Sequence, residues 1–208
     1  MADRGRPRSF DRTVALELAM QVFWKKGYEG SSLNDLTAAM GIGCPSLYAA
    51  FGSKEGLFLE VIDHYSNIVG REIWDAVETA LTARAAMQGF LDATVDAYSR
   101  TDTPQGCLIA LASLHQDSSS GAICSELRRR RAENIDALRR RFRRGVEEAD
   151  LPAGFDCDEA ALFYATTQNG MSIIARDGAS REALAAVASG AMAAFQPLVD
   201  KASASHGS

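Results

Sequence analysis

Residues 31–58 read SSLNDLTAAMGIGCPSLYAAFGSKEGLF, and the helix signals within this stretch decide the fold. Ser32 stands three residues before Asp35, a spacing typical of a capping box at the start of a helix. That helix is expected to end at Met40, since Gly41-Ile42-Gly43 follows as a tight turn. The stretch therefore predicts a short helix that ends in a glycine turn.

Three more helices are expected around this turn. Pro45 suits the first position of the next helix, because proline lacks the N–H that this position leaves unpaired, and that helix ends at Gly52. A longer helix, capped by Ser53, follows from about residue 54 to residue 81. An amphipathic helix precedes the stretch and ends near Gly27. Its apolar positions are Val14, Ala15, Leu18, Ala19, Val22 and Phe23.

Two short helices joined by a glycine-containing turn form the helix-turn-helix layout. In this motif the second helix lies in the DNA major groove, and the first helix braces it across the backbone. Apolar side chains would hold the pair against the preceding helix: Leu36, Met40, Ile42, Leu47 and Phe51. Residues 10–55 are therefore expected to form a DNA-binding domain.

The formal net charge of −5 is not spread evenly along the chain. Residues 1–60 carry seven Lys/Arg and seven Asp/Glu, whereas residues 61–208 carry fifteen and twenty. Residues 1–9 are expected to form a basic flexible arm, in which Arg6 and Arg8 are candidates for phosphate or minor-groove contacts. A solvated terminus that makes no DNA contact is the alternative.

The composition is that of a globular protein, since 47% of the 208 residues are hydrophobic and 24% are charged. The N-terminal arginines have no apolar stretch behind them, and no run approaches the roughly 18 apolar residues that a membrane helix needs. The four cysteines lie far apart without a histidine pair, so neither a metal site nor a disulfide scaffold is expected. We expect a cytoplasmic protein with reduced thiols, no cofactor and no membrane partner.

The stretch from Gly27 to Phe58 resembles the TetR family of transcriptional regulators. The shared elements, in the same order and spacing, are Gly27-Tyr28, Ser31-Ser32, Leu36-Thr37-Ala38-Ala39-Met40-Gly41, Ser46-Leu47-Tyr48 and Phe51-Gly52-Ser53-Lys54-Glu55-Gly56-Leu57-Phe58. The rest of the chain matches only in length and helical character. The resemblance implies an all-α homodimer that binds double-stranded DNA at a palindromic operator, from which a small-molecule effector releases it.

The resemblance also implies which residues contact DNA. Tyr48, Lys54 and Ser31 match positions that contact phosphates, and a phosphate would offset the unfavourable placement of Lys54 at the positive end of a helix dipole. The base-reading tip departs from the common family pattern, because it holds no Arg, Asn or Gln for bidentate base recognition. Such a tip can offer contacts to thymine methyl groups and shape readout. The residues expected at the DNA, besides the arm, are Ser31, Ser32, Cys44, Pro45, Ser46, Tyr48, Ala49 and Lys54.

Residues 56–200 are expected to form a helical domain for effector binding and dimerisation, followed by a disordered tail at 201–208. Its helices are expected at about 84–100, 107–116, 121–149, 156–176 and 180–199. Nine arginines lie between Arg128 and Arg144, interleaved with acidic residues. This pattern favours a solvated, ion-paired helix face over a second DNA-binding surface.

The last two helices are rich in alanine and carry Gly170 and Gly190 near their middles. Small residues allow helices to approach closely, as a four-helix interface between two subunits requires. The family places its dimer contact here, and packing within one chain is the alternative. The expected interface residues are Phe163, Thr167, Gly170, Ala186, Gly190 and Ala194.

The family keeps a pocket for a small effector between the fourth helix and the last two helices. The candidates for its lining are Trp74, Phe90, Tyr98, Cys107, Leu111, His115, Phe163, Gln168 and Met171. Gly106-Cys107-Leu108 opens the short helix that in this family connects the pocket to the DNA-binding domain. Cys107 is therefore either a small hydrophobe that lines the pocket of a reversible ligand or a reactive thiol that senses electrophiles.

Two other classes of protein are less consistent with the sequence. It has no Gly-x-Ser-x-Gly, no phosphate-binding glycine loop and no metal-spaced cluster, which disfavours an enzyme. A helical scaffold protein would explain the C-terminal part but not the combination of Tyr48 and Lys54. Salt-dependent retention on heparin separates these classes, because a scaffold with a net charge of −5 should pass through.

Overall fold

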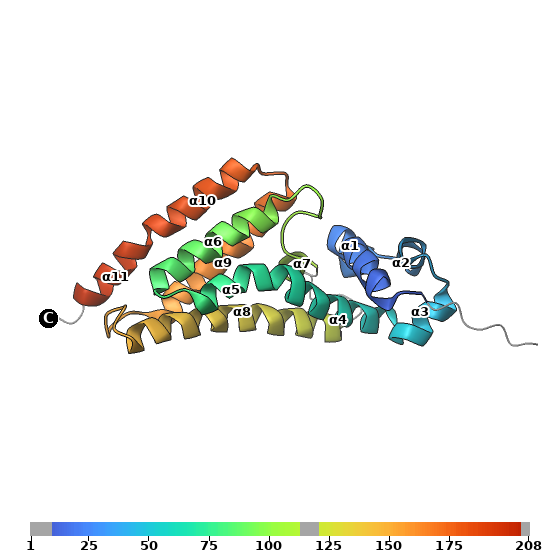
Figure 1. The fold of residues 1–208 in the computed structure, drawn as a ribbon, viewed down its shortest axis with the longest axis horizontal. Coiled ribbons are helices and arrows are strands. Elements are labelled where there is room, and N and C mark those ends of the chain that lie inside the picture. Colours follow the sequence, from blue (N-terminus) through green and yellow to red (C-terminus); the bar gives the residue numbers. More distant parts are fainter. Residues whose placement is uncertain (1–9, 113–120, 205–208) are drawn as a thin grey trace, which may run out of the picture.

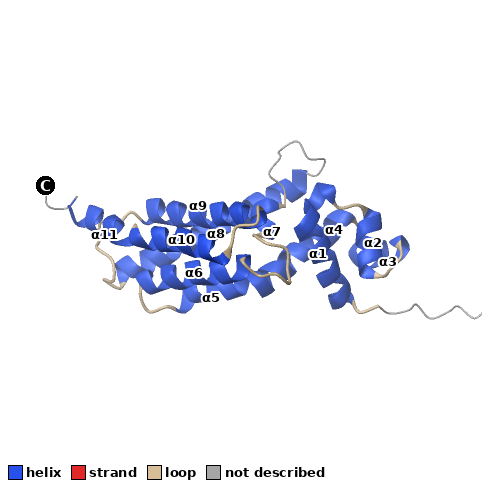
Figure 2. Cartoon of the chain, turned by 90° about the horizontal axis from the view of Figure 1, so that it is seen from above, coloured by secondary structure: helices blue, strands red, loops and turns tan. Residues whose placement is uncertain are grey.

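In the computed structural model, which describes residues 10–112 and 121–204, every regular element is a helix (Figure 1, Figure 2). Three N-terminal helices gather at one end of an elongated molecule, and the later helices form a bundle at the other end (Figure 1). The all-α fold class is therefore confirmed. The predictions for Arg6, Arg8, His115 and residues 205–208 lie outside the described residues.

The helix-turn-helix lies where the sequence indicates it, in α2 (Leu33–Met40) and α3 (Cys44–Phe51). Ser32 and Asp35 form the expected capping box. The Asp35 N–H donates to the Ser32 hydroxyl at 3.0 Å, and the Ser32 N–H donates to the Asp35 carboxylate at 3.0 Å. Gly41 ends α2 with a φ of 67°, a left-handed conformation that glycine adopts without strain.

The core of this domain lies between α1 (Arg12–Gly30) and the two helices of the motif. Leu36 and Leu47 are fully buried, Met40 and Phe51 are nearly so, and Ile42 is half-buried, so the predicted inward positions are confirmed. On α1 the buried residues are Ala15, Leu16, Ala19, Met20, Phe23, Trp24 and Tyr28. Val14 and Leu18 of the expected apolar face are exposed instead, because the face of α1 that meets the core is rotated away from them.

The first helix breaks at Gly27, as expected, where φ is 72° and ψ is 173°, and a further helical turn continues to Gly30. One helix boundary differs from the expectation. The third helix begins at Cys44, so that Pro45 occupies its second position. This position tolerates proline equally well, because the first four N–H groups of a helix have no partner within it.

One continuous helical path leads from the helix-turn-helix into the bundle (Figure 1). It consists of α4 (Lys54–Tyr65), the π-helical segment η1 (Ser66–Gly70) and α5 (Arg71–Thr79). The sequence predicts a single helix over 54–81, and the π-helical turn in its middle is what the sequence did not indicate. Such turns are rare and frequently lie at functional sites, and η1 borders a cavity of the bundle.

The rest of the bundle consists of α6 (Ala83–Tyr98), α7 (Leu108–Leu111), α8 (Gly121–Glu147), α9 (Cys157–Arg176), α10 (Arg181–Ala193) and α11 (Phe195–Ala204). On α8, Leu127, Leu138 and Phe142 are fully buried. The disordered tail expected at 201–208 is wrong for residues 201–204, because α11 continues to Ala204.

The stretch Arg181–Ser203, which spans α10 and most of α11, is long and apolar enough to cross a membrane, with a mean hydropathy of 1.3. No such run was predicted from the sequence. Core helices of soluble proteins meet the same criterion, and Leu184, Ala188 and Met192 pack against the bundle. Only 28% of the most apolar window is buried, so this helix presents a second, uncovered apolar face.

Candidate DNA interface and effector site

The tip of α3 is exposed at the end of the molecule farthest from the bundle (Figure 1). Leu47 and Phe51 bury one side of this helix, so the residues between them point outward. Pro45, Ser46 and Ala49 are exposed, Tyr48 is 47% exposed, and Cys44 is half-buried. The structure thus brings the four predicted base-reading residues, Cys44, Pro45, Ser46 and Ala49, to one surface together with Tyr48, which was predicted to contact a phosphate.

A close contact fixes the orientation of α3 relative to α4. A Cβ at Gly56 would overlap the carbonyl oxygen of Phe51, the last residue of α3. The Gly56 N–H donates to the Ser53 hydroxyl at 2.9 Å, which caps the start of α4. The turn between the two helices is therefore tight, and it depends on a glycine at position 56.

Lys54 lies in the first turn of α4, with its Nζ 4.3 Å from the centroid of the Tyr28 ring. Partial burial lowers the pKa of Lys54, and the nearby Glu29 carboxylate opposes that shift. The ammonium is thus held by the ring in a fixed position rather than extended into solvent. Its predicted contact with a phosphate stays a prediction.

Ser31 and Ser32 have different surroundings. Ser31 is fully buried, and its hydroxyl donates to the Gly27 carbonyl oxygen at 2.6 Å, so the expectation of a phosphate contact at Ser31 is wrong for this conformation. The Gly27 carbonyl oxygen lies within reach of Ser31 because α1 kinks at Gly27. Ser32 is exposed beside Asp35, whose pKa is lowered by hydrogen bonds from Lys26 and Ser32.

The bundle contains a partly open cavity of about 130 Å³ beside η1. Four of the predicted pocket residues line it: Trp74, Tyr98, Cys107 and Gln168. Eight other lining residues were not predicted from the sequence: Tyr65, Ser66, Gly70, Ile73, Ile109, Arg130, Glu133 and Asn134. Half of these residues are polar or charged. The sequence does not show which face of their helices meets the cavity, because that depends on the position of η1.

Four other predicted pocket residues do not line this cavity. Phe90 is fully buried in the core, 5.3 Å from Trp74 between ring centroids, and Met171 is buried as well. Leu111 is half-buried next to Gly106. Phe163 lies on the outer surface of α9 and is 36% exposed, so its assignment to the pocket is wrong. Its side chain points away from the bundle, because Tyr164 takes the inward position on that turn.

Cys107 stands at the N-cap of α7, and its N–H donates to the Ser172 hydroxyl at 2.7 Å. The buried phenols of Tyr65 and Tyr98 are its neighbours. Burial raises the pKa of both tyrosines, and their interaction with Cys107 raises it further. Arg131 and Arg176 also interact electrostatically with Cys107, although neither is adjacent to it in sequence.

The segment around α7 connects the cavity to the DNA-binding domain. The Trp24 indole N–H donates to the Gly106 carbonyl oxygen at 2.9 Å in a buried contact. At the other end of α7, the Tyr28 N–H donates to the Ala112 carbonyl oxygen at 3.3 Å. One short segment therefore borders the cavity at Cys107 and holds α1 by two hydrogen bonds.

The arginine-rich face of α8 is largely ion-paired, as expected. Arg129 pairs with Glu126 and Glu133, Arg130 with Glu126 and Asp63, and Arg139 with Asp136 and Asp158. Arg141 differs from them, since it is 3% exposed and faces α5. The sequence pattern gave no sign that one of nine arginines is buried.

The expected dimer residues lie on the outer face of α9 and α10. Phe163, Gly170, Ala186 and Gly190 are exposed, whereas Thr167 and Ala194 are half-buried. Apolar side chains extend this face: Leu162, Ile173, Ile174 and Val187 are all exposed. Among the described residues, most of the large exposed hydrophobic side chains outside α1 lie on these two helices.

A helix-turn-helix with an exposed second helix, carried on a helical bundle with a cavity beside η1, defines a DNA-binding transcription regulator. Residues 15–61 match the family model of the bacterial regulatory proteins of the tetR family. Residues 83–191 match the tetracyclin repressor-like C-terminal domain. The chain belongs to the TetR family.

Several characterised members of this family are similar over nearly the whole chain. The HTH-type transcriptional repressor ComR of Escherichia coli is 34% identical over 197 residues, which cover 94% of each chain. A cysteine mutant of the TetR family regulator CifR, solved in complex with 26-bp operator DNA, is 47% identical. That match covers 91% of this chain and 100% of the CifR chain, with a TM-score of 0.88. Reduced NemR of Escherichia coli shares the fold, with a TM-score of 0.73 at 21% identity over 86% of this chain and 94% of its own.

Proposed function

We propose that this chain is a repressor that binds a two-fold symmetric operator as a homodimer and leaves it when a small molecule occupies the bundle cavity. The observation that carries the proposal is the position of α7. This segment borders the cavity at Cys107 and holds α1 through Gly106 and Ala112. A ligand that displaces it would change the position of the DNA-binding domain.

The tip of α3 supports the DNA-binding part of the proposal. Pro45, Ser46, Tyr48 and Ala49 are exposed on one surface, with Lys54 nearby at the start of α4. ComR is named a repressor, and CifR was solved with operator DNA. The small, weakly polar tip fits contacts to thymine methyl groups and shape readout. Because Ser31 is buried, the exposed Ser32 hydroxyl is the one that would contact a phosphate at the start of α2.

The outer face of α9 and α10 supports a homodimer. A soluble monomer rarely exposes a contiguous apolar patch of this kind, and two such helices from each subunit form a four-helix interface. Exposed Gly170 and Gly190 allow close approach at the centre of each helix. The chain acts by binding rather than by catalysis, and it acts in the cytoplasm, where its DNA lies.

The proposal is tested by DNase footprinting on the region upstream of the gene that encodes this chain. We expect protection of an inverted repeat whose half-sites lie about one helical turn, or a little more, apart. The control is a variant with Tyr48→Ala and Lys54→Ala combined, which should fold and should not protect. Protection of a single half-site by the wild type, or equal protection by the double variant, would contradict the proposal.

Covalent release through Cys107 is a second candidate mode of regulation. It is favoured by the position of this thiol at the cavity wall, where Arg131 and Arg176 interact electrostatically with it. The Cys107 sulfur would add to an activated C=C bond: a C–S bond forms, the π bond breaks, and the thiol proton ends on the neighbouring carbon. Mass-spectrometric rates of alkylation should then be higher for Cys107 than for Cys157, whose pKa is raised by burial. Equal rates, with release retained in Cys107→Ser, would leave only the reversible mode.

A further inference from the structure

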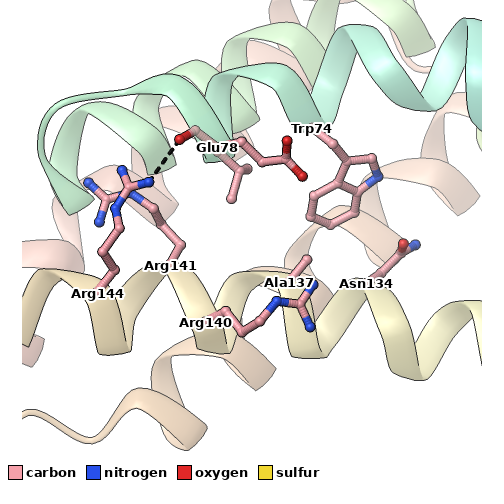
Figure 3. Close-up of a pocket in the computed structure, with 8 residues that line it drawn as sticks. Trp74, Glu78, Asn134, Ala137, Arg140, Arg141 and Arg144 are labelled. Carbon is pink, nitrogen blue, oxygen red and sulfur yellow. Dashed lines mark hydrogen bonds between the residues drawn. The ribbon is translucent and has the colours of Figure 1, made fainter.

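A second cavity, of about 260 Å³, lies between α5 and α8 (Figure 3). It is lined by Trp74, Val77, Glu78, Asn134, Ala137, Arg140, Arg141 and Arg144. The guanidinium groups of Arg141 and Arg144 lie at one end and the Trp74 indole lies at the other (Figure 3). Arg140, like Arg141 and Arg144, belongs to α8. The lining therefore combines three cationic side chains with one aromatic ring.

Arg141 is the unusual member of this set. Its side chain is almost fully buried, with one hydrogen bond from Nη2 to the Ala80 carbonyl oxygen at 3.4 Å. Its Nε and Nη1 are shielded from solvent and make no hydrogen bond within the described residues. Burial lowers the pKa of Arg141, and the adjacent charge of Arg144 lowers it further. A buried cation with unpaired donors is destabilising unless an anion compensates it.

The acidic residues nearby compensate this charge only in part. Arg144 donates to the carbonyl oxygens of Glu78 and Ala80 and lies 3.7 Å from the Glu148 carboxylate. Glu148 and Asp150 also interact with Arg141 from outside the cavity. Glu78 is the one acid in the lining, and its carboxylate makes no ion pair with the three arginines. The lining thus carries three positive charges and one negative charge.

We propose that this cavity binds a small organic anion with a flat apolar body, of the aryl carboxylate class. The carboxylate would neutralise Arg141 and Arg140, since guanidinium groups match carboxylates in geometry and charge. The aromatic ring of the ligand would lie toward Trp74 and Val77, which supply the apolar part of the wall. The cavity is partly open and Arg140 is exposed, so a ligand can enter it from solvent.

Trp74 and Asn134 line both cavities, so an anion in this one contacts the wall of the cavity that holds Cys107. The bound anion would bias the position of Trp74 and, through it, the surroundings of η1. This regulatory consequence rests on the proposed function. Binding of the anion does not, and it can be measured without DNA.

The test is calorimetric titration of the full-length protein with benzoate, and with benzamide as the neutral analogue. We expect saturable benzoate binding and at least tenfold weaker benzamide binding. Arg141→Met should weaken benzoate binding at least tenfold. Arg143→Met is the matched control, because Arg143 is exposed on the same helix and does not line the cavity, and it should bind as the wild type does.

Arg140→Gln keeps the proposal testable if Arg141→Met fails to fold. Arg140 is exposed and makes no ion pair within the described residues, so its loss should leave the fold intact while weakening benzoate severalfold. Benzamide that binds as tightly as benzoate, or benzoate binding unchanged in Arg140→Gln, would overturn the proposal. Operator binding without benzoate is measured in parallel, so a failure of the anion site is distinguished from a failure of the repressor function.

Discussion

At the scale of single residues, Lys54 is predicted to contribute to the grip on the DNA backbone. Its ammonium lies over the Tyr28 ring in the first turn of α4, the helix that follows α3. Lys54→Ala should weaken binding to all sequences about equally and lower the salt slope by about one per subunit contact. Fluorescence anisotropy at several salt concentrations measures both, with Lys54→Arg as the charge-preserving control. A wild-type affinity and slope in Lys54→Ala would remove the residue from the interface.

Gly56 is the residue on which the position of α3 depends. Gly56→Ala places a methyl group against the Phe51 carbonyl oxygen, so α3 and α4 must separate. Overpacking of this kind destabilises by roughly 1–3 kcal/mol, and here it should also reduce operator affinity. Gly30→Ala is the control, because a Cβ there meets Lys26 at an ordinary 3.6 Å. Chemical denaturation and anisotropy check the two effects, and equal behaviour of both variants contradicts the assignment.

What the sequence reveals about a residue depends on how local its partners are. The Ser32–Asp35 capping box and the Gly41 turn were predictable, because their partners lie within a few residues. The burial of Ser31 was not, since its acceptor exists only because α1 kinks at Gly27. Arg141 was hidden among eight similar arginines for the same reason. Its burial is set by α5, more than sixty residues away in the sequence.

At the scale of elements, α7 connects the two domains, and Trp24 is its anchor. Trp24→Phe keeps an aromatic ring but leaves the buried Gly106 carbonyl oxygen without its donor, which destabilises by roughly 1–3 kcal/mol. Hydrogen exchange should show faster exchange at residues 107–112 and at the Tyr28 amide, while α8 stays protected. Tyr164→Phe is the matched control, because it removes a buried hydrogen bond to the Ala191 carbonyl oxygen that does not involve α7. Unchanged exchange at Tyr28 would show that α7 is not held through Trp24.

The helices themselves were predictable because amphipathic periodicity and capping residues are properties of short stretches. The π-helical turn η1 has no such signal, since Ser66–Gly70 suits an ordinary α-helix equally well. The cavity beside it depends on that turn, and four polar or charged residues of its lining were not predicted for this reason: Ser66, Arg130, Glu133 and Asn134. Element positions could be predicted, but not which face of α4 and α8 meets the cavity.

At the scale of the whole molecule, the apolar character of α10 and α11 and the exposed side chains of α9 have one explanation. Leu162, Ile173 and Val187 are exposed on helices whose other faces are buried, and small residues separate them. A second subunit would cover this face. Burial under a second subunit also explains why Arg181–Ser203 resembles a membrane helix by composition, because a subunit interface and a lipid bilayer both favour apolar residues.

The dimer fixes the distance between the two recognition helices, so assembly and specific binding should be lost together. Gly190→Glu places a charged side chain on the exposed face of α10, where a Cβ meets nothing within the subunit. The monomer should therefore fold, while the interface would have to bury an unpaired carboxylate. Light scattering should report a monomer. Anisotropy should show that the affinity for the operator falls toward the nonspecific affinity, because a monomer contacts only one half-site. Ala132→Glu, on the exposed side of α8, should stay dimeric and bind normally. A monomeric Gly190→Glu that still binds the inverted repeat with wild-type affinity would contradict the link between dimer and operator.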